Sequence, residues 1–266
     1  MPRRRLPTNA SADMSGAPER MPVSVVIAAR DEAANIAGCI DSVRWASEIL
    51  VVDQGSGDAT GELATKAGAT VISQEAATIG ALRNAAISRA RNRWVLVVDA
   101  DERGTPELAQ AVRDAISRPT SGAYRVPRRN FFLGREIRHG GWETDRPVRL
   151  FDSALRYNDS RVHEHVLTNE APATLTAALL HYPYASLDIY FEKFVRYSRW
   201  WAEEQSRRGR RASLAAIIFK PPARFISMFV FRMGFLDGAR GAVLASLAAA
   251  SVCAKYVRLW AIQCES

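Results

Sequence analysis

Two carboxylates, two residues apart at the end of an apolar run, constrain the fold of this chain more than any other feature. The run is Val95 to Val98, and Asp99-Ala100-Asp101 follows it directly. A continuous run of β-favouring residues predicts a strand that is covered on both faces, as in a parallel sheet between helices. Carboxylate oxygens at the strand end suit a hard divalent cation, Mg²⁺ or Mn²⁺, which shares its remaining positions with water and a diphosphate.

Three other apolar runs repeat this arrangement, at residues 23–29, 49–52 and 70–72, with helix-length segments between them. Asp31 follows the first run, and Asp53 follows the second and precedes a Gly-Ser turn. Ligands bind beyond the carboxyl ends of the strands in an open parallel sheet. We therefore expect Asp31, Asp53, Asp99 and Asp101 to converge on one crevice.

The ordered segments SVVIAARDEAANI, EILVVDQGSGDAT, GALRNAAI and WVLVVDADER resemble the nucleotide-binding half of family 2 glycosyltransferases with the GT-A fold. The later segments HGGWETDRPVRLF, RVHEH and LLHYPYASLDIYFEKFVRYS resemble the bacterial branch that adds sugars to lipopolysaccharide core and related envelope glycans. The resemblance covers about residues 22–262. It implies an α/β fold with a mixed, mostly parallel sheet flanked by helices. One departure from the family pattern is Gln54 after Asp53, although the Asp itself is kept.

The resemblance also implies roles for individual residues. Asp101 is expected to hold the metal, and Asp99 the ribose or a metal-bound water. Asp53 either binds the nucleoside or caps the helix that begins near Thr60. Other residues expected to line the nucleotide-sugar site are Ala28, Arg30, Glu32, Arg83, Asn84, Trp142 and Arg149.

The acceptor chemistry is expected in the second half. The resemblance places Asp145 in the position of a loop carboxylate, which makes it the first choice for the base that takes the acceptor's proton, with Glu164 second. Trp142 could stack on a sugar or simply pack, and Arg149 could pair with Asp145 or with a phosphate. His163 and His165 share one face if they lie on a strand, but a zinc site is disfavoured because no third ligand has suitable spacing.

The net charge of +8 lies entirely at the C-terminal end. Residues 1–191 hold 23 basic and 23 acidic residues, whereas residues 192–266 hold 13 and 5. Basic residues there bracket short apolar segments, a pattern that favours an anionic lipid surface over nucleic acid. The uncharged stretch 241–254 would rise only about 21 Å as a helix, so we expect it to lie in the membrane interface rather than to cross it. Packing of these helices on the catalytic domain or on a second subunit is the alternative.

These observations divide the chain into a disordered leader (1–21), a catalytic domain (22–185, with a nucleotide-sugar half at 22–118 and an acceptor half at 119–185) and a helical, basic membrane region (186–266). Three widely spaced cysteines suit a reducing cytoplasm. The predicted function is inverting transfer of a sugar from a nucleotide-diphosphate donor, with UDP favoured, to a lipopolysaccharide-core, lipid-linked or other envelope acceptor at the cytoplasmic face of the inner membrane. A nucleotidyltransferase acting on sugar phosphates and a non-catalytic membrane adaptor are the alternatives.

Overall fold

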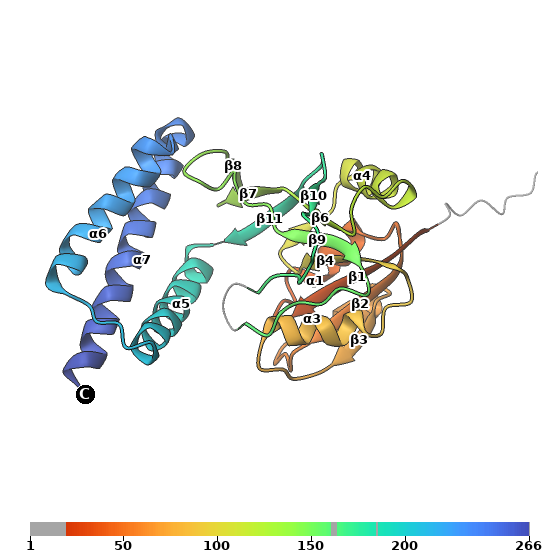
Figure 1. Ribbon diagram of the computed structural model, residues 1–266, viewed down its shortest axis with the longest axis horizontal. Coiled ribbons are helices and arrows are strands. Elements are labelled where there is room, and N and C mark those ends of the chain that lie inside the picture. Colours follow the sequence, from red (N-terminus) through yellow and green to blue (C-terminus); the bar gives the residue numbers. More distant parts are fainter. Residues whose placement is uncertain (1–19, 161–163, 185, 266) are drawn as a thin grey trace, which may run out of the picture.

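The computed structural model describes residues 20–160, 164–184 and 186–265. Figure 1 shows two lobes, one built on β-sheets and one made of the helices α5, α6 and α7. The leader, expected at residues 1–21, lies almost wholly outside the described residues, and its last residue begins the first strand. The strands are β1 (Met21–Ala29), β2 (Ala46–Asp53), β3 (Thr70–Ser73), β4 (Trp94–Asp99), β5 (Glu102–Arg103), β6 (Ala123–Arg125), β7 (Arg128–Phe132), β8 (Arg135–Ile137), β9 (Val148–Asp152), β10 (Ala173–Thr174) and β11 (Leu179–Tyr184).

The main sheet has the strand order β10-β6-β9-β4-β1-β2-β3. All neighbouring strands are parallel except β9, which runs antiparallel to β4 and β6. The predicted mixed, mostly parallel sheet is therefore confirmed. The register aligns Ala28 with Asp99 and Ala29 with Asp53, so the acidic strand ends meet at one edge of the sheet.

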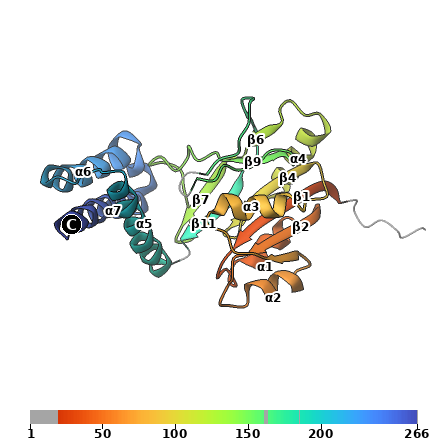
Figure 2. The ribbon, with the colours of Figure 1, turned by 60° about the horizontal axis from the view of Figure 1, so that its bottom comes forward.

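Helices cover both faces of this sheet, as the continuous apolar runs predict. The helices are α1 (Ile36–Ser42), α2 (Thr60–Lys66), α3 (Ile79–Ile87) and α4 (Pro106–Ser117). Alternate residues of β1 point to opposite faces: Val25 packs in a core with α1, α2 and α4, and Val26 packs in a core with α3. Figure 2 shows α3 on one side of the sheet and α1 and α2 on the other.

A second sheet, in the order β5-β11-β7-β8, begins directly after the acidic pair. Pro127 separates β6 from β7, which is consistent with the interruption expected there from its missing N–H. Because β4 ends at Asp99 and β5 begins at Glu102, the Asp99-Ala100-Asp101 turn joins the two sheets. Side chains from both sheets can therefore reach this turn.

The helical lobe comprises α5 (Leu187–Arg207), α6 (Leu214–Ile226), a π-helical turn η1 (Ser227–Phe231), a 3₁₀ turn η2 (Gly234–Asp237) and α7 (Gly238–Cys264). A third apolar cluster attaches this lobe to the second sheet. Its buried members are Phe132, Ile137, Tyr190 and Leu244. The cluster fixes α5 beside β11, where the ring centroids of Tyr184 and Tyr190 lie 4.9 Å apart.

The long C-terminal helix changes the expectation about the membrane. Its uncharged stretch was expected to be too short to cross a bilayer, but α7 has 27 residues and rises about 40 Å. Within the described residues, two segments are long and apolar enough to span, Leu214–Phe231 and Gly234–Cys264. Length alone therefore does not restrict these helices to the membrane interface.

Candidate active site

The loops after β1 and β2 are joined by hydrogen bonds at the strand ends. Asp31 has a positive φ of 54°, and its Oδ1 accepts the N–H of Gly57 at 2.8 Å. Asp53 Oδ1 accepts the backbone N–H of Ser56 at 2.9 Å, so this Asp shapes the Gly-Ser turn. It does not cap α2, because Asp58 Oδ1 accepts the N–H of Thr60. Within the described residues, the second oxygen of Asp53 makes no such hydrogen bond and lies close to Gly61.

Asp99 lies in a cage of three arginines from three different elements. Arg83 on α3 contacts its Oδ1 at 2.5 Å, Arg128 on β7 contacts its Oδ2 at 2.9 Å, and Arg149 on β9 also pairs with Oδ2. Glu102 completes the cage: its side chain is 0% exposed, and it pairs with Arg128 and Arg149. Its Oε2 also accepts the backbone N–H of Asp99 at 2.8 Å.

This cage keeps Asp99 ionised. Burial alone would raise the pKa of Asp99, but attraction to Arg149, Arg83 and Arg128 outweighs it and holds the pKa well below its ordinary range. Burial alone would lower the pKa of Arg149. Attraction to Asp99 and Glu102 outweighs burial, so the pKa of Arg149 is raised. Guanidinium groups contact both carboxylate oxygens of Asp99. Asp101 forms no ion pair with an arginine among the described residues, so it is the member of the acidic pair that could better coordinate a metal.

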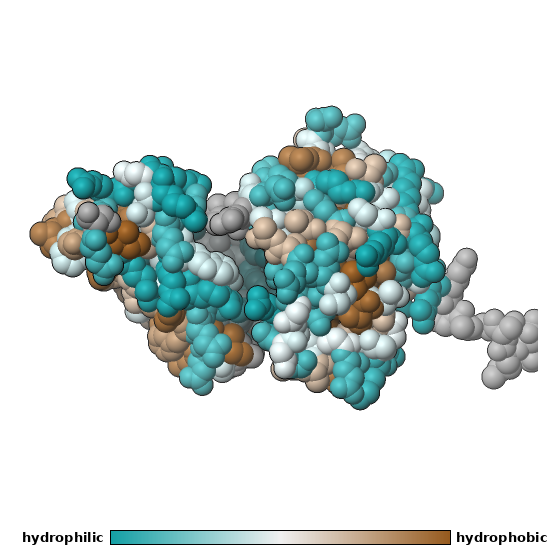
Figure 3. All heavy atoms as spheres, turned by 90° about the horizontal axis from the view of Figure 1, so that it is seen from below, coloured by the Kyte–Doolittle hydropathy of each residue, from teal (hydrophilic) through white to brown (hydrophobic). Residues whose placement is uncertain are grey.

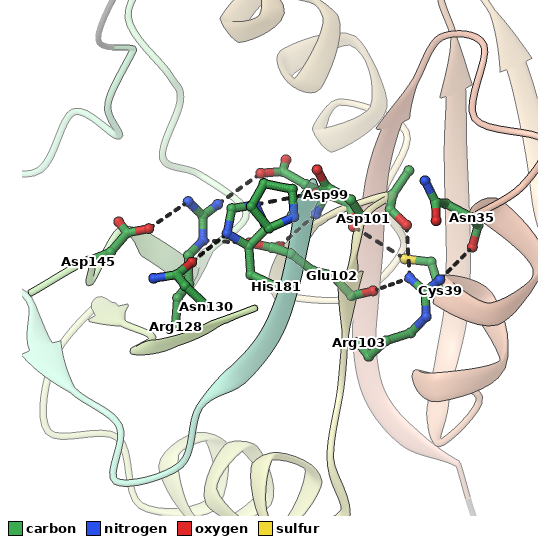
Figure 4. Close-up of polar contacts among 12 residues, drawn as sticks. Asn35, Cys39, Asp99, Asp101, Glu102, Arg103, Arg128, Asn130, Asp145 and His181 are labelled. Atoms are coloured by element: carbon green, nitrogen blue, oxygen red, sulfur yellow. Dashed lines mark hydrogen bonds and ion pairs between the residues drawn. The ribbon is translucent and has the colours of Figure 1, made fainter. Parts of the chain in front are cut away.

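Asp101 has a different set of neighbours. His181 on β11 places Nε2 3.6 Å from Oδ1 of Asp101 (Figure 4), and Lys193 on α5 places Nζ 3.5 Å from Oδ2 of Asp101. Asn130 fixes the imidazole: its Nδ2 donates to the carbonyl of Trp142 at 2.8 Å, which turns its Oδ1 to the Nδ1 of His181 at 2.6 Å. Nδ1 then carries the proton, so Nε2 presents a lone pair toward Asp101.

The chemistry of this pair fits a divalent cation. Burial lowers the pKa of His181, and the attraction of Asp101 opposes the effect only in part, which favours the neutral imidazole that metal binding requires. A neutral nitrogen held by a hydrogen-bonded amide beside a carboxylate is the arrangement that ligating histidines have. No group of three or more His, Cys, Asp or Glu side chains suited to a metal occurs in the described part of the chain. The remaining positions would fall to water and a diphosphate, as is usual for Mg²⁺.

The two carboxylates expected to act as base lie on opposite sides of the cage. Asp145 Oδ2 is 3.1 Å from Nη1 of Arg128, and its side chain is 40% exposed. Glu164 Oε1 is 3.0 Å from Nη1 of Arg83, whose side chain is only 4% exposed. Figure 4 shows Arg128 between Asp145 and Asp99. A line of alternating charges thus connects Asp145, through Asp99, to Glu164.

Four other predicted site residues lie outside the arginine cage around Asp99. Arg30 is largely exposed beside Asp31, and Ala28 is half-buried at the end of β1. Burial raises the pKa of Glu32, whose Oε2 accepts a hydrogen bond from Asn35. Asn84 uses both ends of its amide on the backbone of Tyr157, at 2.9 Å each, so it anchors α3 instead of facing a ligand.

Trp142 belongs to the third apolar cluster, with its ring centroid 6.2 Å from that of Tyr184, which supports the packing alternative. The zinc alternative involves His163, which lies outside the described residues. Its partner His165 is on no strand and lies beside Asn158, with 3.1 Å between Nδ1 and the amide nitrogen.

Comparison with known proteins identifies the family. The profile of glycosyl transferase family 2 matches residues 24–168. The chain belongs to glycosyl transferase family 2. It is 28% identical over 254 residues to the lipopolysaccharide core biosynthesis glycosyltransferase LpsC of Rhizobium meliloti (strain 1021), covering 88% of this chain and 92% of LpsC.

Solved structures of glycosyltransferases are also similar. S. aureus TarS is 14% identical and has a TM-score of 0.48, with 92% of each chain covered. Glucosyl-3-phosphoglycerate synthase from Mycobacterium tuberculosis, solved with Mn²⁺, UDP and glucosyl-3-phosphoglycerate, is 19% identical with a TM-score of 0.38 and covers 50% of this chain and 57% of its own. The family assignment confirms the predicted glycosyltransferase with a GT-A-type sheet, and it leaves the nucleotidyltransferase and adaptor alternatives without support.

Proposed function

We propose that this glycosyltransferase moves a sugar from a nucleotide-diphosphate donor, with UDP favoured, to a lipopolysaccharide-core or related envelope glycan, with inversion at the anomeric carbon. The observation that carries the proposal is the arrangement around Asp99. Asp101 and His181, which would hold the cation, lie on one side, and the half-exposed carboxylate of Asp145 lies on the other, beside Arg128. Donor and acceptor can thus meet between them.

In this mechanism the chain's own residues remove a proton from the acceptor and stabilise the negative charge of the diphosphate. An acceptor hydroxyl is a weak acid, so the Asp145 carboxylate takes its proton as the oxygen bonds to the anomeric carbon and the bond to the diphosphate breaks. Attack from the side opposite the leaving group inverts the configuration. Asp101 and His181 would hold a divalent cation, which neutralises charge on the departing diphosphate. Arg128 and Arg149 contribute fixed positive charge nearby.

The acceptor class is supported by similarity to LpsC over most of both chains. An open groove of about 680 Å³ along α5 offers a surface for such an acceptor. The groove presents Arg196 and Arg199, which suit phosphate or carboxylate groups of a glycan, beside Asp188 and Glu192, which suit its hydroxyl groups, and Phe191 suits the face of a sugar ring. We assign this groove to the acceptor.

Membrane association is supported by the apolar surface of the helical lobe, where Figure 3 shows hydrophobic patches beside hydrophilic residues. Phe231 is 80% exposed at the turn between α6 and α7, and Phe219 is 68% exposed. Exposed apolar side chains on a region with 13 basic and 5 acidic residues suit an anionic bilayer. We place the enzyme at the cytoplasmic face of the inner membrane, where nucleotide sugars are made.

A donor panel tests this proposal. Purified enzyme is incubated with UDP-, GDP-, CDP- and dTDP-sugars with and without Mn²⁺, and release of the nucleoside diphosphate is measured. We expect slow, metal-dependent hydrolysis of one UDP-sugar, accelerated by truncated lipopolysaccharide-core acceptors. NMR of the product reports the anomeric configuration. Transfer with retention, or equal rates with and without metal, would overturn the mechanism.

A further inference from the structure

Lys193 lies on the helical lobe but reaches the donor site. It is on α5, and its Nζ is 3.5 Å from Oδ2 of Asp101. Two further contacts hold it there: Nζ donates to the carbonyl of Pro183 at 3.1 Å and lies 5.6 Å from the ring centroid of Tyr184. The side chain is 22% exposed, so it is not a freely moving surface lysine.

The packing around Lys193 explains this fixed position. Its neighbours Tyr190 and Phe194 belong to the third apolar cluster, which also contains Tyr184. The cluster also includes Leu244 of α7. Helix α5 is therefore held between the second sheet and α7. The helical lobe therefore contributes one cationic group to the pocket of Asp101.

The position of Lys193 has an electrostatic consequence. The arginines of the cage contact Asp99, whereas Asp101 lies beside Lys193, with the His181 ring on its other oxygen. A divalent cation bound at Asp101 without nucleotide would be repelled by the ammonium group. A diphosphate reverses this, because its oxygens can pair with the metal and with Lys193 together.

We infer that Lys193 couples the metal to the nucleoside diphosphate: it weakens binding of the metal alone and strengthens binding of the two together. This inference rests on the proposed donor chemistry. It assigns to the C-terminal lobe a binding residue for the leaving diphosphate, in addition to membrane contact. By linkage, bound metal raises the affinity for nucleotide by the same factor as bound nucleotide raises the affinity for metal, and Lys193 increases that shared factor.

Isothermal titration calorimetry on the full chain tests the inference with Mn²⁺ alone and with UDP or GDP in saturating Mn²⁺. In Lys193→Met we expect affinity for Mn²⁺ alone to rise about fivefold and affinity for the nucleoside diphosphate to fall about tenfold, the scale of a partly screened charge contact. Lys193→Arg keeps the charge and should stay within about threefold of wild type. Lys66→Met, which removes an exposed lysine on α2, is the matched control.

In Lys193→Met the expected changes in Mn²⁺ affinity and in nucleotide affinity have opposite signs, which distinguishes this role from a purely structural one. If Mn²⁺ and nucleotide affinity fall together in Lys193→Met and Lys193→Arg alike, the lysine only holds α5, and the inference is wrong. Nucleotide affinity within twofold of wild type in Lys193→Met also overturns it. If the wild type binds neither UDP nor GDP, the proposed donor fails. The Mn²⁺ titration then decides alone, and unchanged Mn²⁺ affinity in Lys193→Met refutes the pairing.

Discussion

Replacing Asp145 with asparagine separates catalysis from folding most sharply. Asp145→Asn keeps the shape of the side chain but removes its ability to accept a proton. The carboxylate is 40% exposed and pairs with Arg128 at 3.1 Å, so the free energy of unfolding should fall by no more than about 1 kcal/mol. The backbone carbonyl of Asp145, which accepts the N–H of Arg128, is unaffected.

The effect on turnover should be much larger. Loss of a general base typically costs a hundredfold or more, which corresponds to about 2.7 kcal/mol in the activation barrier. We expect the turnover number of Asp145→Asn to fall by at least that factor at saturating donor, while Mn²⁺ and nucleotide affinities stay near wild type. The assay combines initial rates with calorimetry and urea unfolding on the same preparations.

Glu164→Gln should lose more stability and less turnover than Asp145→Asn. Glu164 pairs with buried Arg83, which would keep only Asp99 as a carboxylate partner, so stability should fall by about 1–3 kcal/mol with a smaller loss of turnover. Asp152→Asn is the control, because Asp152 is another arginine-paired Asp at the far end of β9. If Asp145→Asn retains more than about a tenth of wild-type turnover while Glu164→Gln is inactive, the assigned roles are reversed.

Three further outcomes are expected. Asp101→Ala should abolish Mn²⁺-dependent binding of UDP without changing the circular dichroism spectrum, and unchanged affinity by calorimetry would contradict the metal assignment. Glu136 has a pKa of about 2, against an ordinary value of 4.5, because Arg129 and Arg138 stabilise its charge. Its contribution to stability is therefore present above pH 4.5 and lost as the pH falls through about 2, so urea midpoints should decline less steeply over this range in Glu136→Gln than in wild type. Full-length protein should sediment with phosphatidylglycerol vesicles, Phe231→Asp should do so less, and a chain ended after residue 212 should stay in solution; equal binding to neutral vesicles would show that charge is irrelevant.

The sheet and its acidic edge could be predicted from sequence because their signals are local. A run such as Val95 to Val98 records burial on both faces in consecutive residues, and parallel pairing then places the strand ends together. The prediction that Asp53 and Asp99 meet at one edge needed no knowledge of distant contacts.

The composition of the site could not be predicted in the same way. Arg128 and Arg149 reach Asp99 from 29 and 50 residues away, and nothing in a single sequence links guanidinium groups to a chosen carboxylate over such separations. His181 was missed although it lies in the quoted segment LLHYPY. Its neighbour Asn130 belongs to another strand, and an isolated His between apolar residues is typical of a core position. Glu102 follows the acidic pair directly, yet nothing in the sequence indicates that it lies fully buried among the arginines.

The cage also shows why a buried charge cluster can persist at this site. Two buried carboxylates, Asp99 and Glu102, face three guanidinium groups, and at the rim Asp145 pairs with Arg128 and Glu164 pairs with Arg83. The Nε atoms of Arg83 and Arg149 are buried and have no hydrogen-bond partner among the described residues, which costs free energy. Evolution for stability alone would favour apolar replacements of such a cluster. Its retention is understandable if the guanidinium groups serve an anionic ligand, because a diphosphate arriving beside Asp101 meets side chains already oriented by Asp99 and needs no further ordering of them.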